Sequence, residues 1–349
     1  MSKYFPSNPY VYDILHQPEA FQNTLDSILS GSMDHFYHLA DDLRLGKINQ
    51  VVLTGMGSSY HALHPIYLDL LTAGISAQMI ETSELIHHAQ SLVRKDNVIV
   101  AVSQSGASAE VLELIKMAPA GLQMVGITNN QNTPLAERSD HLLLTHAGEE
   151  NSVSCKTYIT ALVALTFLKN LLTGQEFIKT QVEFQNLPDL IATYLSNLDE
   201  WVDELETLLH NIQYLILAGR GSSLASAGTG GLIIKESAHF PAEGMSSAAF
   251  RHGPMDMISS EIFILVFEGQ DPTSQLNRKL VDEIRQLGGR AAIVGPSSDI
   301  PAFKLPAVPS AALPVLEILP VQMISLALAK MKAIDPGQFK LGSKVTRDE

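Results

Sequence analysis

The chain has 349 residues, 46% of them hydrophobic, which is enough for two α/β domains with a substantial core. Its formal net charge of −14, from 37 acidic and 23 basic residues, argues against an extended nucleic-acid surface, because such a surface needs clustered lysine and arginine. The single cysteine, Cys155, excludes an internal disulfide and a multi-cysteine metal site.

No targeting or membrane segment is expected. The N-terminus, MSKYFPSNPYVYD, lacks the apolar centre of a signal peptide, and no apolar stretch is expected to reach the length of a membrane span. The sequence therefore predicts a cytoplasmic protein with no membrane or nucleic-acid partner.

The first half of the chain alternates predicted strands with predicted helices. An N-terminal helical segment, residues 1–49, is expected to hold helices at 18–30 and 33–45. Alternation of this kind indicates a doubly wound, mainly parallel sheet of flavodoxin-like type. The predicted strands of this half are 51–53, 75–80, 98–102, 123–128 and 142–145.

A hydroxyl-rich turn follows the predicted strand at 98–102, whose continuous apolar run is typical of a buried parallel strand. The turn reads SQSG at 103–106, with Ser108 two residues later. Gly106 permits an unusual backbone turn, and the free N–H groups of a following helix favour an anion. The pattern predicts a phosphate cradle, although a plain helix cap is the alternative. It has no lysine and does not match the nucleotide P-loop.

The pattern then starts again. GRGSS at 219–223 copies GMGSS at 55–59, and strands are predicted at 214–218, 263–267, 291–294 and 315–319. The chain is therefore interpreted as two copies of one α/β unit, at 50–195 and 196–330, with a tail at 331–349. The second copy has no counterpart of the SQSG serines, which predicts one phosphate site per chain, at the C-terminal ends of the strands.

Taken together, the two G-x-G-S-S segments, SQSG, the pair Lys235-Glu236 and the HGP segment at 252–254 resemble the sugar isomerase (SIS) family. The resemblance runs from about residue 51 to residue 346. In pattern the chain is similar to the isomerase half of glucosamine-6-phosphate synthase and to stand-alone amino-sugar phosphate deaminases and deglycases. It implies two tandem SIS domains, no cofactor, and a homodimer with the active site near the subunit interface.

The resemblance also implies roles for individual residues. Glu236 matches the carboxylate that moves a proton between C1 and C2 of the sugar, and His252 matches the histidine of ring opening, acting in its own chain or across the dimer. Lys344 resembles the tail lysine that closes over the sugar, with Lys340 as the competing choice. The residues implied to bind the phosphosugar are Ser59, Ser103, Gln104, Ser105, Ser108 and Ser154.

Physical reasoning is compatible with two of these roles and leaves the alternatives open. Apolar neighbours would raise the pKa of Glu236 toward neutrality, as proton transfer requires, whereas an ordinary glutamate is solvated. His252 has a reference pKa close to neutral, but it could instead donate to a carbonyl in its own turn. The histidines form no H-E-x-x-H pattern, so no metal is predicted, and neither G-x-G extends to a dinucleotide motif.

The chain departs from the synthase at charged positions. Ile233 and Ala249 stand where the synthase has a lysine and a glutamate, and the tail reads SKVT where the synthase reads KSVT. The glutaminase half and its N-terminal cysteine nucleophile are not in this sequence. We therefore predict an isomerase or deaminase for an amino-hexose 6-phosphate of the glucosamine 6-phosphate or fructose 6-phosphate type. The alternatives are a fructosamine-6-phosphate deglycase and a non-catalytic phosphosugar-binding regulator.

Overall fold

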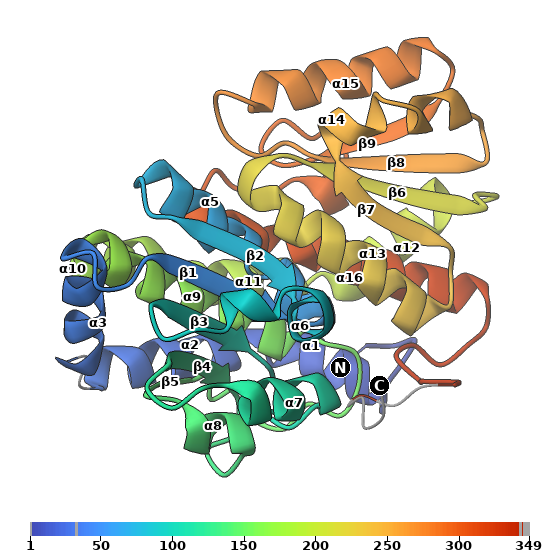
Figure 1. Cartoon of the computed structure of the whole chain (residues 1–349). Helices are drawn as coiled ribbons and strands as arrows, with labels where there is room; N and C mark the ends of the chain where they lie inside the picture. Colours follow the sequence, from blue (N-terminus) through green and yellow to red (C-terminus); the bar gives the residue numbers. More distant parts are fainter. Residues whose placement is uncertain (1, 32–33, 342–343, 345–349) are drawn as a thin grey trace. The chain divides into compact units, whose positions relative to one another are not determined.

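Two parallel β-sheets organise the chain (Figure 1). The computed structural model describes residues 2–31, 34–341 and 344. The chain divides into two units, each built around one sheet. Unit 1 consists of Met1–Pro18, Asn151–Ser154 and Asn186–Lys340, and unit 2 of Glu19–Glu150, Cys155–Gln185 and Leu341–Glu349.

The sheet of unit 2 has five parallel strands with β3 at its centre. All residues of β3 are buried, as expected for an apolar strand covered on both faces. Gly55, the last residue of β1, lies opposite Val102, the last residue of β3, so the turns that follow these strands leave the same edge. In spatial order the strands are β2 (Ala77–Glu81), β1 (Gln50–Gly55), β3 (Asn97–Val102), β4 (Gln123–Thr128) and β5 (His141–Leu144).

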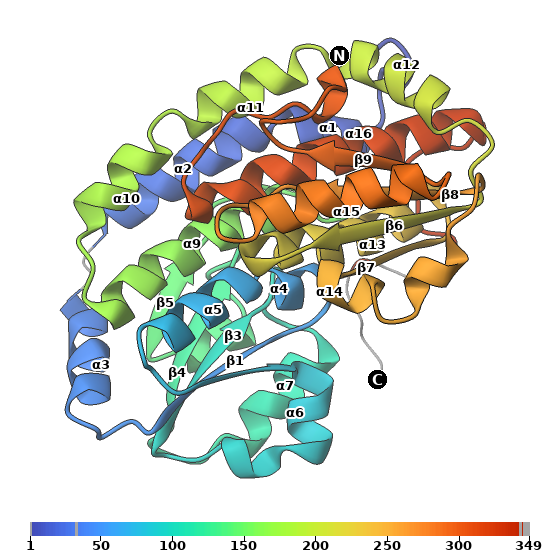
Figure 2. The same cartoon turned by 90° about the horizontal axis from the view of Figure 1, so that it is seen from above.

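Helices cover both faces of this sheet (Figure 2). α6, α7 and α8 pack on one face, where the core includes Val52, Ile99, Leu114 and Met124. α9, whose residues are almost all buried, packs on the other face together with α3 and α5. The helices of unit 2 are most of α2 (Gln17–Ser30), then α3 (Asp34–Arg44), α4 (Gly57–His61), α5 (His64–Thr72), α6 (Thr82–His88), η1 (Gln90–Leu92), α7 (Ala109–Met117), α8 (Pro134–Arg138), α9 (Lys156–Thr173) and α10 (Phe177–Phe184).

The sheet of unit 1 has four parallel strands in an order that matches the first four positions of the other sheet. The order is β7 (Ala242–Ser246), β6 (Tyr214–Gly219), β8 (Ile262–Phe267) and β9 (Arg290–Val294). α13 and α16 lie on one face with α12 beside them, and α14 and α15 lie on the other (Figure 1). The helices of this unit are α1 (Pro9–Leu15), α11 (Leu187–Leu195), α12 (Leu198–Leu208), η2 (Gly221–Ser223), α13 (Leu224–Ala238), α14 (Ser247–Phe250), η3 (Pro254–Met257), α15 (Ser274–Gln286), η4 (Pro301–Phe303), η5 (Ser310–Ala312) and α16 (Leu313–Met331).

These sheets confirm the predicted fold class, two doubly wound parallel-sheet units, but one predicted strand is wrong. Residues 315–319 lie inside α16, a helix that is buried along almost its whole length. An unbroken apolar run has no period that separates a buried strand from a buried helix, and the 19-residue length of α16 decides the matter. β7 is a strand that sequence patterning missed, because its sequence AEGMS is short and only partly buried.

The same helix overturns the expectation about apolar length. Residues Ser310–Met331 have a mean hydropathy of 1.8 and are long and apolar enough to cross a membrane, but 94% of that window is buried within the protein. α16 packs against α12 and α13, so its apolar surface belongs to a core. At the N-terminal end of the chain, the predicted helix at 33–45 corresponds to α3, and Met33 lies outside the described residues.

Candidate active site

The turn after β1 carries Ser59 at the C-terminal edge of the unit 2 sheet. Gly55 allows this turn to pack closely on β3, because a Cβ there would lie 3.0 Å from the carbonyl oxygen of Val102 and 3.1 Å from the backbone of Ser59. Gly57 has a φ of +54°, and α4 begins at this residue. Ser59 therefore sits half-buried in the first turn of α4, at the edge where β3 also ends.

The SQSG turn follows β3 at the same edge and is fixed by its own backbone. Ser103 N donates to Ile127 O at 3.0 Å, and Gly106 N donates to the carbonyl and to the hydroxyl oxygen of Ser103, each at 3.2 Å. Gly106 has a φ of +62°, and a Cβ there would lie 2.4 Å from Thr133 Oγ1, so only glycine fits. These contacts fix the shape of the turn.

Hydroxyl protons in this turn remain available to a ligand. Ser103 Oγ accepts from Gly106 N, and Ser105 Oγ accepts from Ala107 N at 3.3 Å, so each hydroxyl keeps its own proton for donation. Ser108 is the N-cap of the nine-residue helix α7, and its side chain makes no capping bond. The free N–H groups at that helix start favour an anion. Gln104 is half-buried in the same turn, and its backbone carbonyl oxygen accepts a hydrogen bond from Thr128 Oγ1.

The tail residue Lys344 pairs with a buried carboxylate in unit 2. Glu150 is fully buried, and its Oε2 accepts from Lys344 Nζ at 2.8 Å and from Thr157 Oγ1 at 2.6 Å. Its Oε1 accepts from the backbone N–H groups of Cys155 and Thr157 at 3.0 and 3.1 Å. Burial raises the pKa of Glu150, but the charge of Lys344 and these hydrogen bonds outweigh it, so the pKa is lowered overall.

Glu150 is a residue that sequence reasoning missed. Ser154 is the predicted sugar-binding residue of this segment, and the carboxylate that receives the tail lysine lies four residues earlier. Ser154 itself is half-buried and belongs to unit 1, unlike the five other predicted sugar-binding residues. The competing tail lysine, Lys340, is exposed and also belongs to unit 1.

Unit 1 holds Glu236, which lies half-buried on α13 between buried neighbours, including Ile233 and Ser237. α13 packs tightly on β7, because a Cβ on Gly231 would lie 2.6 Å from Gly244 N. Lys235 is exposed, and adjacent residues of a helix do not face each other. Glu236 is therefore fixed on a rigid element beside β7.

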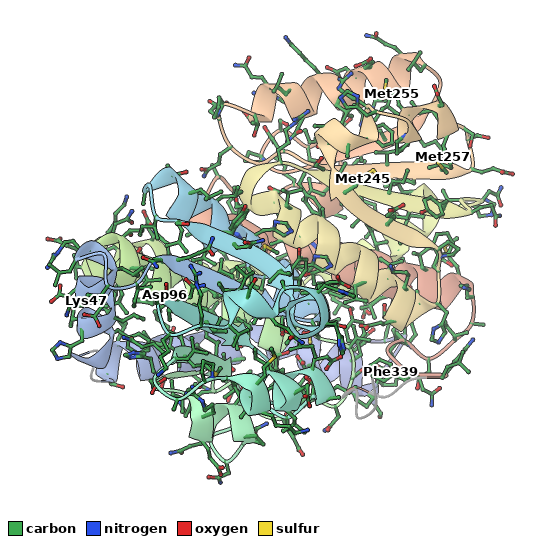
Figure 3. The ribbon with its side chains drawn as sticks, in the orientation of Figure 1. Lys47, Asp96, Met245, Met255, Met257 and Phe339 are labelled. Atoms are coloured by element: carbon green, nitrogen blue, oxygen red, sulfur yellow. The ribbon has the colours of Figure 1, made fainter. Side chains whose placement is uncertain are left out.

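His252 lies beyond the end of β7, in an exposed turn whose flanks are anchored. Its backbone N–H donates to Ala249 O at 2.9 Å, and the next residue, Gly253, has a φ of +130°. Met245 and Met255, labelled in Figure 3, pack against the core on either side of it in sequence. Among the described residues, no carbonyl accepts a hydrogen bond from the His252 ring in the structure.

The opposite edge of the unit 2 sheet has a different character. Lys47 and Asp96, labelled in Figure 3, lie just before β1 and β3, and Lys47 pairs with Asp42 at 2.9 Å. Among residues 2–31, 34–341 and 344, no group of three or more histidine, cysteine or acidic side chains is arranged to hold a metal ion.

A family of known proteins matches both halves of the chain. The model of the SIS domain matches residues 44–170 and 208–330. The glutamine–fructose-6-phosphate aminotransferase (isomerizing) of Pyrococcus horikoshii is 30% identical over 338 residues, which cover 93% of this chain and 55% of the relative. The chain thus spans about half the length of the curated relatives it matches.

Solved structures have the same fold. The C-terminal domain of glucosamine-fructose-6-phosphate aminotransferase from Francisella tularensis has a TM-score of 0.84 and 26% identity, and the match covers 97% of this chain and 100% of that one. The glucosamine-6-phosphate deaminase of Thermotoga maritima has a TM-score of 0.72 at 18% identity, with 97% of this chain and 100% of that one covered. At that identity the second likeness concerns the fold alone.

Proposed function

Because the chain belongs to the SIS domain family, we propose that it is a phosphosugar isomerase or deaminase acting on an amino-hexose 6-phosphate of the glucosamine 6-phosphate or fructose 6-phosphate type. The observation that carries the proposal is the turn at 103–108. Its serine hydroxyls and the adjacent start of α7 together offer the hydrogen-bond donors that a phosphate group needs. A 30% identical relative with an isomerizing aminotransferase name supports the amino-sugar class.

In the proposed reaction the sugar phosphate is held by the hydroxyls of Ser59, Ser103 and Ser105. His252 takes the proton of the anomeric hydroxyl and gives one to the ring oxygen, which opens the ring. Glu236 then removes the proton from one of C1 and C2 and returns it to the other, through an enol-type intermediate. For an amino sugar, this transfer converts the aldose into a ketose imine, which water splits into ketose phosphate and ammonia.

Lys344 has a distinct place in this proposal. Its Nζ lies 2.8 Å from the buried carboxylate of Glu150, which holds it in place. We assign Lys344 to the stabilisation of negative charge that develops on the sugar oxygens. Glu150 acts through Lys344 and is a positioning residue.

A fructosamine-6-phosphate deglycase stays the alternative. Ile233 and Ala249 stand where the synthase has charged residues, and in the structure Ile233 is fully buried whereas Ala249 is exposed. A cytoplasmic homodimer remains part of the proposal, because the family resemblance implies it. The exposed position of His252 is compatible with a role across such a dimer.

Ligand-dependent thermal unfolding tests the proposal with glucosamine 6-phosphate, fructose 6-phosphate and a fructosamine 6-phosphate, followed by a product assay. A ligand at one hundred times its Kd adds about 2.7 kcal/mol of stability. We expect Ser103→Ala/Ser105→Ala to lose the shift, while Ser222→Ala, in the turn after β6 of unit 1, retains it. Glu236→Gln should bind the sugar without turnover.

The outcomes separate the candidate functions. Ammonia, isomer or free amino acid as product identifies a deaminase, an isomerase or a deglycase. A sugar that binds through the serines of unit 2 without any product makes the protein a regulator. If no sugar phosphate stabilises the chain, the proposed substrate class is wrong.

A further inference from the structure

The turn after β6 in unit 1 has the same G-x-G-S-S sequence as the turn that carries Ser59. Ser223 takes the position of Ser59 in that pattern, at the end of the strand that corresponds to β1 in sheet order. Ser223 is fully buried and is the N-cap of the 15-residue helix α13. The turn that carries Ser59 in the first SIS segment therefore has a direct counterpart in the second segment, at the same edge of the sheet.

This counterpart is already filled by a side chain of unit 1. Glu317, from α16, is fully buried, and its Oε1 accepts from Ser223 Oγ at 2.7 Å. Its Oε2 accepts from Ser226 Oγ, in the first turn of α13, at 2.9 Å. The carboxyl group thus lies at the start of a helix and accepts a hydrogen bond from each of the two hydroxyls. An oxyanion ligand bound there would have the same position and the same hydrogen bonds.

The neighbouring strand ends in a second acid. After β8, where the other unit has its serines after β3, Glu268 is buried and accepts from the N–H and hydroxyl of Ser297 at 2.9 and 2.8 Å. It also pairs with Arg278. A pocket beside these groups is lined by Gly269, Gly295 and Glu317 with apolar side chains, and none of its lining residues, all of which the structure describes, carries a positive charge.

We propose that Glu317 supplies, from within the chain, the acid group that fills the oxyanion position of the second SIS segment, and so leaves one phosphosugar site per chain. The inference uses the proposed role of the Ser59 turn as its reference. The latent ligand class is a small oxyanion such as a carboxylate or phosphate. Removal of the Glu317 side chain should therefore expose a site that Ser223 and Ser226 complete.

Chemical rescue tests this proposal in the full-length chain. The background carries Ser103→Ala/Ser105→Ala, so that the first turn does not contribute. Thermal unfolding is followed with sodium formate or inorganic phosphate, against sodium chloride at equal ionic strength. We expect formate to raise the unfolding midpoint of Glu317→Ala by a few degrees in a saturable manner. The same salt should have no specific effect on Glu317→Gln, which keeps the volume filled.

A matched variant makes the result decisive. Adding Ser223→Ala to Glu317→Ala should abolish the rescue, because one hydroxyl donor is lost. A formate or phosphate shift that is equal in Glu317→Ala, Glu317→Gln and the Ser223→Ala combination would overturn the proposal, and so would the absence of any specific shift.

If Glu317→Ala does not fold, binding stoichiometry in the otherwise unaltered protein decides. We expect one phosphosugar per chain, removed completely by Ser103→Ala/Ser105→Ala. A second binding event that Ser223→Ala removes would overturn the proposal. If no sugar binds at all, the proposed function fails, whereas rescue by formate still supports the role of Glu317, so the two failures are distinguishable.

Discussion

Replacing Glu317 by glutamine should remove a pH dependence of stability that the fold creates. Burial raises the pKa of this carboxyl from 4.5 to about 7, and the hydrogen bonds from Ser223 and Ser226 only partly oppose the effect. Glutamine has the same shape, and a serine hydroxyl can turn to accept from its amide, so Glu317→Gln should fold. The variant therefore isolates the titration of a single group.

The direction in which the free energy of unfolding changes with pH depends on which state, folded or unfolded, keeps the proton. Below pH 4.5 the carboxyl is protonated in both states, and it contributes no pH dependence. Between 4.5 and about 7 the unfolded chain loses the proton while the folded protein keeps it, so the unfolded state gains favour as pH rises. A rise in pKa from 4.5 to about 7 corresponds to a loss of about 3 kcal/mol of stability across that interval.

Urea unfolding at closely spaced pH values from 4.5 to 8 measures this effect. We expect the free energy of unfolding of the unaltered protein, minus that of Glu317→Gln, to fall by about 3 kcal/mol over the range and then to level off. Glu261→Gln, at an exposed glutamate, is the control for the loss of one carboxyl group. Parallel stability curves for the protein and Glu317→Gln would show that the buried carboxyl is ionised throughout, and would refute the reasoning.

Three further predictions concern other parts of the fold. Gly106→Ala should destabilise the protein by about 1 to 3 kcal/mol and weaken phosphosugar binding. Gly46 also has a positive φ, but the space around it is open, so Gly46→Ala should lower the stability measured by thermal unfolding less and leave phosphosugar binding unchanged. Glu150→Gln should lower kcat more than it changes sugar affinity, and the loss should not add to that of Lys344→Met; additive losses would contradict a positioning role. Tyr194→Phe removes a buried hydroxyl that donates to a backbone carbonyl at 2.7 Å, and should lower the free energy of unfolding by about 1 to 2 kcal/mol; an unchanged urea midpoint would count against it.

Strand positions were predictable where apolar runs end in turn residues. β3, β4, β6 and β8 all lie within a residue or two of the predicted ranges, because each is a short apolar run bounded by glycine or polar residues. The helix α16 was not predictable in the same way, since it is buried on every side and its apolar residues show no period. The apolar run at 315–319 has the length of a strand, and only the whole segment 313–331 has the length of a buried helix.

The geometry of the candidate site was predictable where it depends on a single strand and its following turn. SQSG directly after β3 indicated hydroxyls at a sheet edge, and the structure has that turn built and fixed by Gly106. Pairings between distant segments left no local signal. Lys344 and Glu150 are 194 residues apart, and Ser223 and Glu317 are 94 residues apart, so only the folded chain brings them together.

We propose that the G-x-G-S-S turns of the two units differ in role because their partners differ. In unit 2, the serines that follow β3 keep their protons for an outside acceptor, and α7 starts beside them. In unit 1, the acid on α16 accepts from Ser223, the last residue of the turn, and from Ser226 in the first turn of α13. A buried hydroxyl that already donates to a carboxyl group has nothing left for a phosphate. By this proposal, ligand binding at such a turn depends less on its own sequence than on the acid that a distant helix brings to it.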